Sequence, residues 1–282
     1  MGGATGRENS SVHRFPPIGR YVVTHRDARL VRRVAGLCRR FLAWYENECH
    51  DPWTNGERFV LDAVAAAEPA CIFDVGANVG GWTEMARLRC PSAEVHAFEI
   101  SPPTLASLRD RTAGDRMVRC VATGLSDAPG TVRLRHFPDH PELTTASDFP
   151  HAATAEEIEA PVTTGDRYAE EAAIDRIDLL KIDVEGMEHR VLAGFEALFA
   201  RGAVQTVQFE YGRVNILSGH LLRDFSAFFE SHGFVLGKIF PDHVDFRPYS
   251  LVDEDFRGPN YLACRAARDD LIEVLGGRGA AC

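Results

Sequence analysis

The chain has 282 residues, 45% of them hydrophobic, which is enough to bury one substantial core. Acidic residues outnumber basic ones by 41 to 31, and the formal charge is −10. This charge disfavours a nucleic acid or an anionic membrane as the main partner, and it favours a small-molecule substrate. We expect one catalytic domain with an N-terminal elaboration.

The seven cysteines form no Cys-x-x-Cys pair, and their odd number and scattered spacing are typical of free thiols in a reducing compartment. The N-terminus lacks the apolar stretch of a signal peptide, and no run of about 18 apolar residues occurs. These features predict a cytoplasmic protein. Only Lys181 and Lys238 are lysines; this arginine bias, with abundant alanine, indicates a GC-rich bacterial gene.

Residues 1–20 are polar and rich in Gly, Ser and Pro, which predicts a flexible leader. Residues 21–67 are expected to form a helical cap. From Asp27 to Tyr45, apolar residues recur at helical spacing with arginines on the other side, which predicts a helix packed against the core rather than on a membrane surface. A second helix is expected from Glu57 to Ala67, before Pro69.

Strands and helices then alternate. Short apolar runs predict buried strands at residues 71–75, 94–100, 117–123, 177–183 and 203–210. The segments between them predict helices at residues 81–90, 102–113, 188–200 and 219–231. The repeated strand-helix order predicts an α/β fold with a doubly wound, mainly parallel sheet and helices on both faces.

The segment from Gly130 to Asp166 interrupts this rhythm. A strand is expected at 131–137 and extended chain at 161–166, with residues 137–161 as a lid insertion over the substrate. Later in the chain, GFVLGKIF and GPNYLACR predict two strands of a closing hairpin, and residues 267–282 form a tail.

The segment DVGANVGGWT lies between the first strand and the following helix. Its glycines allow a tight turn, and the free N–H groups at a helix start attract an anionic ligand. Asn78 stands where a dinucleotide-binding loop has its second glycine, so a compact carboxylate fits better than a pyrophosphate. A purely structural turn is the alternative. The candidate cofactor-binding residues in this loop are Asp74, Gly76, Asn78, Gly80 and Trp82.

Glu99 ends the second strand, which lies beside the first in a doubly wound sheet. A carboxylate there can accept both hydroxyl protons of a ribose, whether of NAD or of S-adenosylmethionine. Capping of the helix after Ser101 is the alternative role. Ile100 is a further candidate for cofactor binding, and Leu125 and Ser126, after the third strand, would face an adenine.

Acidic side chains also follow the later strands. Asp183 and Glu185 lie at the end of one strand, where ligands bind in such folds, although helix capping could explain such acids. The candidate catalytic residues are Asp183, Glu185, Glu210 and His243, whereas His189 is expected to lie one turn too deep. Trp53, Asn55, Tyr211, Arg213 and Asn215 are candidates for substrate binding, with packing or ordinary loop roles as alternatives.

Taken in order, DVGANVGGWT, FEISP, the LSD after strand three, KIDVEGMEH and QFEYG resemble the FkbM-type methyltransferases over roughly residues 55–265. The resemblance implies a Rossmann-like methyltransferase domain at 68–266 whose last strand is antiparallel, with S-adenosylmethionine as methyl donor. It also implies mainly O-methylation of sugars, polyketides or other secondary metabolites, as in natural product biosynthesis.

Carried over by residue, the resemblance implies that Gly76, Asn78 and Gly80 contact the methionine part of the cofactor. Glu99 would bind the ribose, Ser126 would lie near the adenine, and Asp183, a further cofactor contact, would lie close to the reacting centre. The first 50 residues match nothing in the family.

The expected reaction is methylation of a hydroxyl of a small molecule, free or bound to a carrier. A divalent cation such as magnesium on Asp183, Glu185 and Glu210 is possible but not favoured, because the acids lack the spacing of a metal cage. The alternatives are N- or C-methylation, an NAD-dependent oxidoreductase, for which no YxxxK pair is present, and a non-catalytic binding module. The Arg-rich helix offers a route to a homo-oligomer.

Overall fold

A computed structural model of the chain describes residues 16–137, 144, 156–258 and 260–277. The chain divides into two compact units, residues 1–45 and 46–282. The first unit contains helix α1 (Pro17–Thr24), which begins with proline in its first turn, and helix α2 (Arg29–Tyr45). No residue of either helix is buried. That α2 packs on the core stays a prediction. So do the domain limits at residues 67 and 266.

The second unit is built on an eight-stranded sheet with the order β10-β9-β11-β8-β7-β1-β2-β3. Strands β1, β2, β3, β7 and β8 are parallel, whereas β11 runs antiparallel between β8 and β9. The mostly parallel α/β sheet with an antiparallel last strand is therefore confirmed. The strands are β1 (Cys71–Val75), β2 (Glu94–Phe98), β3 (Val118–Val121), β7 (Ile177–Ile182), β8 (Val204–Glu210), β9 (Phe234–Phe240), β10 (His243–Phe246) and β11 (Asn260–Arg265).

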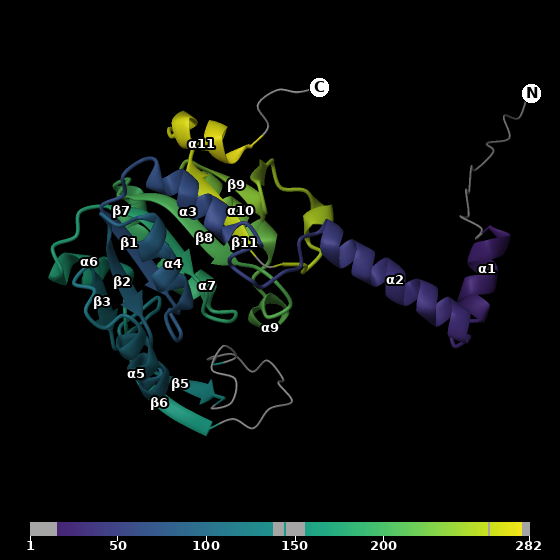
Figure 1. Cartoon of the computed structure of the whole chain (residues 1–282), viewed down its shortest axis with the longest axis horizontal. Helices are drawn as coiled ribbons and strands as arrows, with labels where there is room; N and C mark the ends of the chain where they lie inside the picture. Colours follow the sequence, from purple (N-terminus) through teal and green to yellow (C-terminus); the bar gives the residue numbers. More distant parts are fainter. Residues whose placement is uncertain (1–15, 138–143, 145–155, 259, 278–282) are drawn as a thin grey trace, which may run out of the picture. The chain divides into compact units, whose positions relative to one another are not determined.

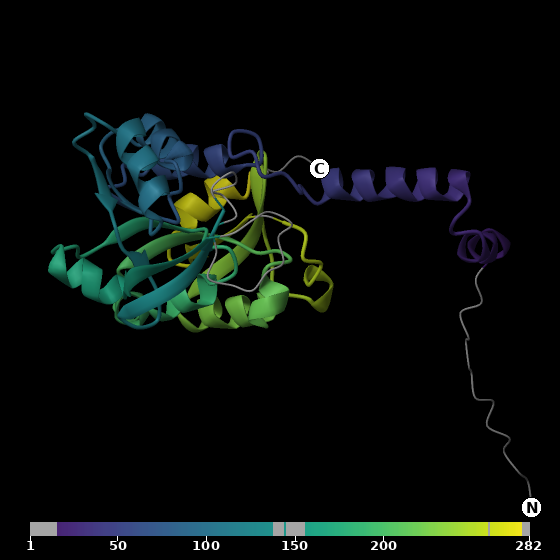
Figure 2. The same cartoon turned by 90° about the horizontal axis from the view of Figure 1, so that it is seen from below.

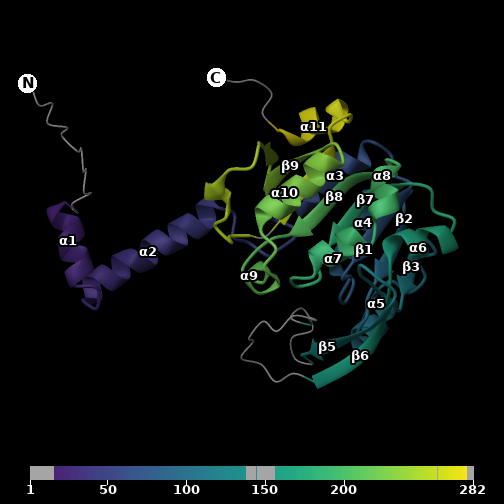
Figure 3. The ribbon, with the colours of Figure 1, turned by 180° about the vertical axis from the view of Figure 1, so that it is seen from behind.

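Helices cover both faces of this sheet, as Figures 1 and 3 show from opposite sides and Figure 2 shows edge-on. One layer contains α3 (Glu57–Ala65), α4 (Gly81–Arg89), α5 (Pro102–Arg111) and α11 (Asp269–Leu275). The other contains α6 (Gly165–Glu171), α7 (Glu188–Ala193), α8 (Glu196–Ala200) and α10 (Leu222–Ser231), and α9 (Asn215–Ser218) is a short turn of helix. Every residue of β1 is buried, because side chains of both its faces meet helices.

Two elements differ from the sequence predictions. The helix expected at 188–200 is divided into α7 and α8 at Gly194, where an added Cβ would lie 2.1 Å from the carbonyl oxygen of Ser126. Strand β10 was not predicted, and it forms a hairpin with β9. The two strands expected at the C-terminus do pair with each other, but β10 separates them along the chain.

A small second sheet has the order β4-β6-β5, formed by β4 (Gly124–Leu125), β5 (Gly130–His136) and β6 (Glu156–Thr163). β6 begins earlier than the extended chain expected at 161–166, and residues from Gly165 belong to α6, which the Thr164 side chain caps. Most of the predicted lid at 137–161, and most of the predicted leader, lie outside the described residues. None of the helices that the structure describes is long and apolar enough to cross a membrane.

Candidate active site

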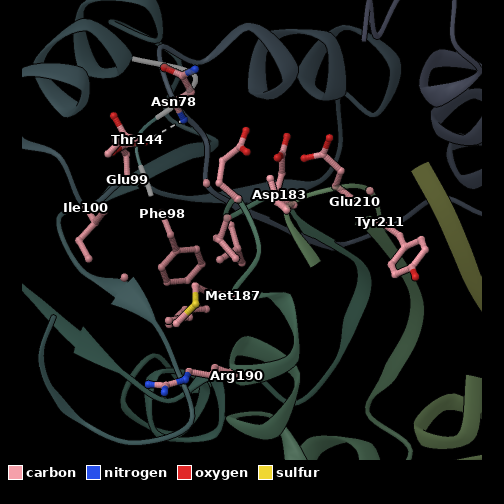
Figure 4. Close-up of a pocket in the computed structure, with 18 of the residues that line it drawn as sticks. Asn78, Phe98, Glu99, Ile100, Thr144, Asp183, Met187, Arg190, Glu210 and Tyr211 are labelled. Atoms are coloured by element: carbon pink, nitrogen blue, oxygen red, sulfur yellow. Dashed lines mark hydrogen bonds between the residues drawn. The ribbon is translucent and has the colours of Figure 1, made fainter. Parts of the chain in front are cut away.

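A cavity of about 700 Å³ lies at the carboxyl ends of β1, β2, β7 and β8. Figure 4 shows Asp183 and Glu210 next to each other on one side of it, with Asn78, Glu99 and Phe98 on the other. Eleven of the residues proposed from the sequence line it: Gly76, Asn78, Glu99, Ile100, Leu125, Ser126, Asp183, Glu185, Glu210, Tyr211 and Arg213.

The turn after β1 brings two strand ends together. Gly76 has a φ of +84°, and a Cβ there would lie 1.8 Å from the carbonyl oxygen of Asp183. A side chain would therefore separate β1 from the end of β7 and also strain the backbone. This explains why a glycine is needed at this turn, and it places the first loop directly beside the acidic strand end.

Glu99 lies on the opposite wall and is buried. Its Oε2 accepts a hydrogen bond from the backbone N–H of Asn78 at 3.0 Å, and its Oε1 accepts one from that of Ser101 at 2.7 Å. Burial raises the pKa of Glu99 to about 6, although these hydrogen bonds lower it. Each carboxylate oxygen keeps a further lone pair, so the group can still accept hydrogen bonds from a ligand diol.

Two further features make this half of the cavity suitable for a nucleoside with a polar tail. The side-chain oxygen Oδ1 of Asn78 is buried and has no hydrogen-bond partner among the described residues. A ligand donor would satisfy this atom, since buried polar groups are normally hydrogen-bonded. The wall between Glu99 and Arg190 is apolar, with Phe98, Ile100 and Met187 on it.

Three carboxylates lie on the other half of the cavity. Asp183, Glu185 and Glu210 each offer an oxygen within 4.8 Å of the others. Burial raises the pKa of Glu210 well above its ordinary value, and the nearby charges of Asp183, Glu185 and Glu188 raise it further. Glu210 is also hydrogen-bonded to Asp183. Glu210 therefore keeps its proton to a higher pH than an isolated carboxyl group does.

A buried lysine accompanies this pair. The Nζ of Lys181 lies 3.2 Å from Oδ2 of Asp183 and 3.3 Å from Oδ1 of Asp74. Burial lowers the pKa of Lys181, but attraction to Asp183, Asp74 and Glu57 outweighs this effect and raises it above the ordinary value. The ammonium group therefore stays charged between the carboxylates of Asp183 and Asp74.

Glu57, at the start of α3, links three elements next to the cavity. Its carboxylate accepts hydrogen bonds from the side chains of Asn55 at 2.8 Å, Asn260 at 2.9 Å and Gln208 at 2.6 Å. Burial raises the pKa of Glu57, whereas Lys181 lowers it. With three amide donors already bound to it, Glu57 holds α3 against β8 and β11.

The loop after β7 has an unusual backbone. Glu185 has a φ of 54°, in the left-handed region that non-glycine residues rarely adopt. The side chain of Glu188 accepts hydrogen bonds from the backbone N–H groups of Val184 at 3.2 Å and Gly186 at 3.0 Å. Burial raises the pKa of Glu188 to about 7, partly offset by those hydrogen bonds. Glu188 thus fixes the loop that carries Asp183 and Glu185.

Three candidates for cofactor binding do not line the cavity. Asp74 is buried beneath it and accepts a hydrogen bond from Oγ1 of Thr83 at 2.6 Å, which joins β1 to α4. Gly80 packs against Leu108 instead. Trp82 is buried, with the Lys181 ammonium 5.5 Å from its ring centroid. Asp74 and Trp82 therefore support the site through Lys181 rather than by facing the cavity.

His243 does lie at the carboxyl edge of the sheet, opposite Phe240 at the end of β9, but it does not line the cavity. It belongs to β10, the outermost strand and three strands away from β8, and its ring stacks on Phe240. Among the substrate candidates, Trp53 is 46% exposed and does not line the cavity. Asn55 and Asn215 are buried and bond within the protein, to Glu57 and to the backbone N–H of Gly212 respectively.

Some cavity residues gave no signal in the sequence. Arg190 and Met187 lie in or just before α7, where only the strand-end motif drew notice. His50, whose Nδ1 lies 3.7 Å from Oε1 of Glu210, precedes the sheet in a segment without periodicity. Thr144 lies in the predicted lid. A strand-end rule cannot find such residues, because they reach the cavity from other elements.

Comparison with known proteins decides the family. The model described as "Methyltransferase FkbM domain" matches residues 74–248, which includes most of the cavity wall. The chain belongs to this family. Its members' methyl donor is S-adenosylmethionine. The wall that contains Asn78 and Glu99 fits that molecule, because it offers both a buried amide oxygen without a partner among the described residues and an acceptor for a diol.

Several curated relatives align with this FkbM-family chain. It is 36% identical over 153 residues to the 31-O-demethyl-FK506 methyltransferase FkbM of Streptomyces tacrolimicus, covering 44% of this chain and 59% of the relative. It is 28% identical over 158 residues to the methyltransferase sdnD of Sordaria araneosa, covering 44% and 60%. It is 28% identical over 189 residues to the hexuronic acid methyltransferase AglP of Haloferax volcanii, covering 64% and 72%. The alignments thus span about 60% of the first two relatives' length.

Proposed function

We propose that the protein is an S-adenosylmethionine-dependent O-methyltransferase that acts on a hydroxyl group of a small molecule. The observation that carries the proposal is the hydrogen-bonded pair of Asp183 and Glu210 in the same cavity as the donor-binding wall around Glu99. The name of one relative, a 31-O-demethyl-FK506 methyltransferase, supports oxygen as the acceptor atom.

The donor would lie along the wall of β1 and β2. Glu99 would accept the ribose hydroxyls, and the apolar side chains of Ile100 and Leu125 would pack on the adenine. Gly76 and Asn78 would hold the methionine end of the donor, and Asn78 Oδ1 would accept a hydrogen bond from its ammonium group. When bound, S-adenosylmethionine supplies an electrophilic methyl group, and the protein's task is to align an acceptor oxygen with it.

The acceptor hydroxyl must lose its proton as the methyl group is transferred. The Asp183–Glu210 pair lies where it can receive that proton, since both carboxyl groups face the cavity (Figure 4). Lys181 fixes the orientation of Asp183 through their contact of 3.2 Å. The raised pKa of Glu210 lies closer to the pKa of the acceptor hydroxyl than that of an ordinary carboxyl group does. This favours proton transfer from the hydroxyl near neutral pH.

The three carboxylates would also be the ligands of a divalent cation, if the reaction used one. Lys181 already provides a positive charge to Asp183, so a cation would have to compete with the ammonium group. This favours proton transfer to the carboxyl pair without a metal. Tyr211 and Arg213 would contact the acceptor, because both line the same half of the cavity.

Calorimetric titration with S-adenosylhomocysteine, and with NAD in parallel, tests the donor site. We expect micromolar affinity for the first ligand, none for NAD, and a loss of affinity of at least about tenfold in Glu99→Ala, because two ribose hydrogen bonds to a charged group disappear. Glu196→Ala, an exposed acid at the start of α8, is the matched control. Binding of NAD alone would contradict the proposal.

Hydroxylated acceptors, including sugars and polyketides, can then be screened for methyl transfer with magnesium and with a chelator. We expect methyl transfer to oxygen, at a rate that the chelator does not lower. A product methylated on nitrogen or carbon would refute the choice of acceptor atom while leaving the donor site intact.

A further inference from the structure

Helix α2 has two chemically distinct halves. Successive residues of an α-helix are turned by about 100°, which places ten mainly apolar side chains on one half of α2: Leu30, Val31, Val34, Ala35, Leu37, Cys38, Phe41, Leu42, Trp44 and Tyr45. The other half has five arginines: Arg29, Arg32, Arg33, Arg39 and Arg40. The helix contains no acidic residue.

The apolar half is accessible within its own unit. Leu37 is 58% exposed, Phe41 63% and Trp44 78%, and no side chain of α2 is buried. Helix α1 adds Ile18, Val22 and Val23, which are also exposed. Large apolar side chains gathered on one face in this way mark an interaction surface.

The charge of the chain is divided between the two units. The first 45 residues contain nine arginines against two acids, a formal charge of +7, whereas the other residues contain 22 basic against 39 acidic groups, a charge of −17. The total of −10, which disfavours an anionic membrane for the chain as a whole, therefore hides a strongly basic unit. Screening confines the repulsion from the acidic unit to roughly 8 Å at physiological salt.

We propose that α2 binds the surface of an anionic lipid bilayer, with its apolar half in the boundary between headgroups and acyl chains and its arginines at the phosphates. A wide apolar half with aromatic side chains, opposite an arginine-rich and acid-free half, is what such interfacial helices require. Each arginine near an anionic surface contributes favourably through the surface potential. The proposal is independent of the methyl-transfer reaction.

A second copy of α2 fits this surface less well. Leu30, Val34, Leu37, Phe41 and Trp44 have the spacing of a coiled-coil seam. The apolar half is wider than such a seam, however, and 17 residues provide only about two heptads. In a pair of helices, Arg33 and Arg40 would flank the seam with no acid in either helix to oppose them. A lipid surface instead supplies the missing negative charge.

Sedimentation of the full chain with vesicles tests the proposal. We expect it to pellet with phosphatidylcholine vesicles that contain phosphatidylserine, much less with phosphatidylcholine alone, and less as salt is raised. Phe41→Asp should weaken binding at least about tenfold, because it removes an aromatic ring that would be buried in the bilayer. Leu251→Asp, at a site 80% exposed in the second unit, is the matched control and should bind like the wild type.

A charge-reversed variant, Arg32→Glu with Arg39→Glu, should lose the preference for anionic vesicles. Unchanged thermal unfolding midpoints establish that the variants are folded. The proposal is overturned if the full chain does not pellet with anionic vesicles, or if Phe41→Asp and Leu251→Asp bind equally well. A dimer in light scattering that Phe41→Asp dissociates, without vesicle binding by the wild type, would assign the surface to a second copy.

Discussion

At Gly76, a single hydrogen atom in place of a side chain allows two strand ends to meet. We predict that Gly76→Ala lowers the free energy of unfolding by at least about 2 kcal/mol, because a Cβ would lie 1.8 Å from the carbonyl oxygen of Asp183 at a φ of +84°. Chemical denaturation measures the change. Gly81→Ala is the control: nothing lies within 4 Å of its added Cβ, and its effect should be close to zero or slightly stabilising.

The carboxyl pair gives a pH-dependent prediction. Because its pKa is raised, Glu210 holds its proton to higher pH, and the methylation rate should increase as that proton is lost. Asp183→Asn should lower kcat about 10²- to 10⁴-fold. Glu210→Gln should lower kcat and move the acidic limb of the pH profile to lower pH.

Single-turnover rates across pH test this prediction, with Glu230→Gln on α10 as the control. An unchanged acidic limb in Glu210→Gln would assign the base to another group.

On the scale of elements, the β7–α7 loop depends on Glu188. Its folded pKa of about 7 lies above the ordinary value of 4.5, so the stability linked to its proton is fully present below pH 4.5 and is lost as pH rises through 7. Glu188→Gln cannot lose this proton. From pH 5 to 8 the wild type should therefore lose up to roughly 3 kcal/mol relative to the variant.

Urea unfolding at several pH values measures that difference. Glu196→Gln, exposed on α8, should follow the wild type at each pH. A parallel response of wild type and Glu188→Gln would mean that the carboxyl group is already ionised in the fold.

The strand periodicity and the strand-end rule predicted much of this architecture from the sequence. Short apolar runs marked the parallel strands, and acids at their ends marked Glu99, Asp183 and Glu210, which line one cavity. His243 lies at the expected edge but outside the cavity, because the sequence does not show that β10 is the outermost strand, three strands from β8. Arg190 was missed because it belongs to no motif. In the sequence it looks like any arginine on the surface of a helix, and only the tertiary packing brings it to the cavity.

On the scale of the whole molecule, all the described residues that line the cavity belong to the second unit, from Glu48 to Asn260. We predict that residues 46–282, produced alone, bind S-adenosylhomocysteine within about twofold of the full chain's affinity, since no donor contact is removed. Calorimetry on both proteins tests this. A tenfold loss, with the shortened protein folded by circular dichroism, would mean that the first unit contributes to the donor site.

The position of β11 has a consequence for biosynthesis. This strand is the last of the sheet to be synthesised, yet it occupies an interior place, paired with β8 on one side and β9 on the other. Its Asn260 also hydrogen-bonds Glu57, 203 positions earlier in the chain. While the chain is still on the ribosome, β9 and β10 have no neighbour to join them to the sheet. These two strands can therefore join the sheet only after residue 265 has left the exit tunnel.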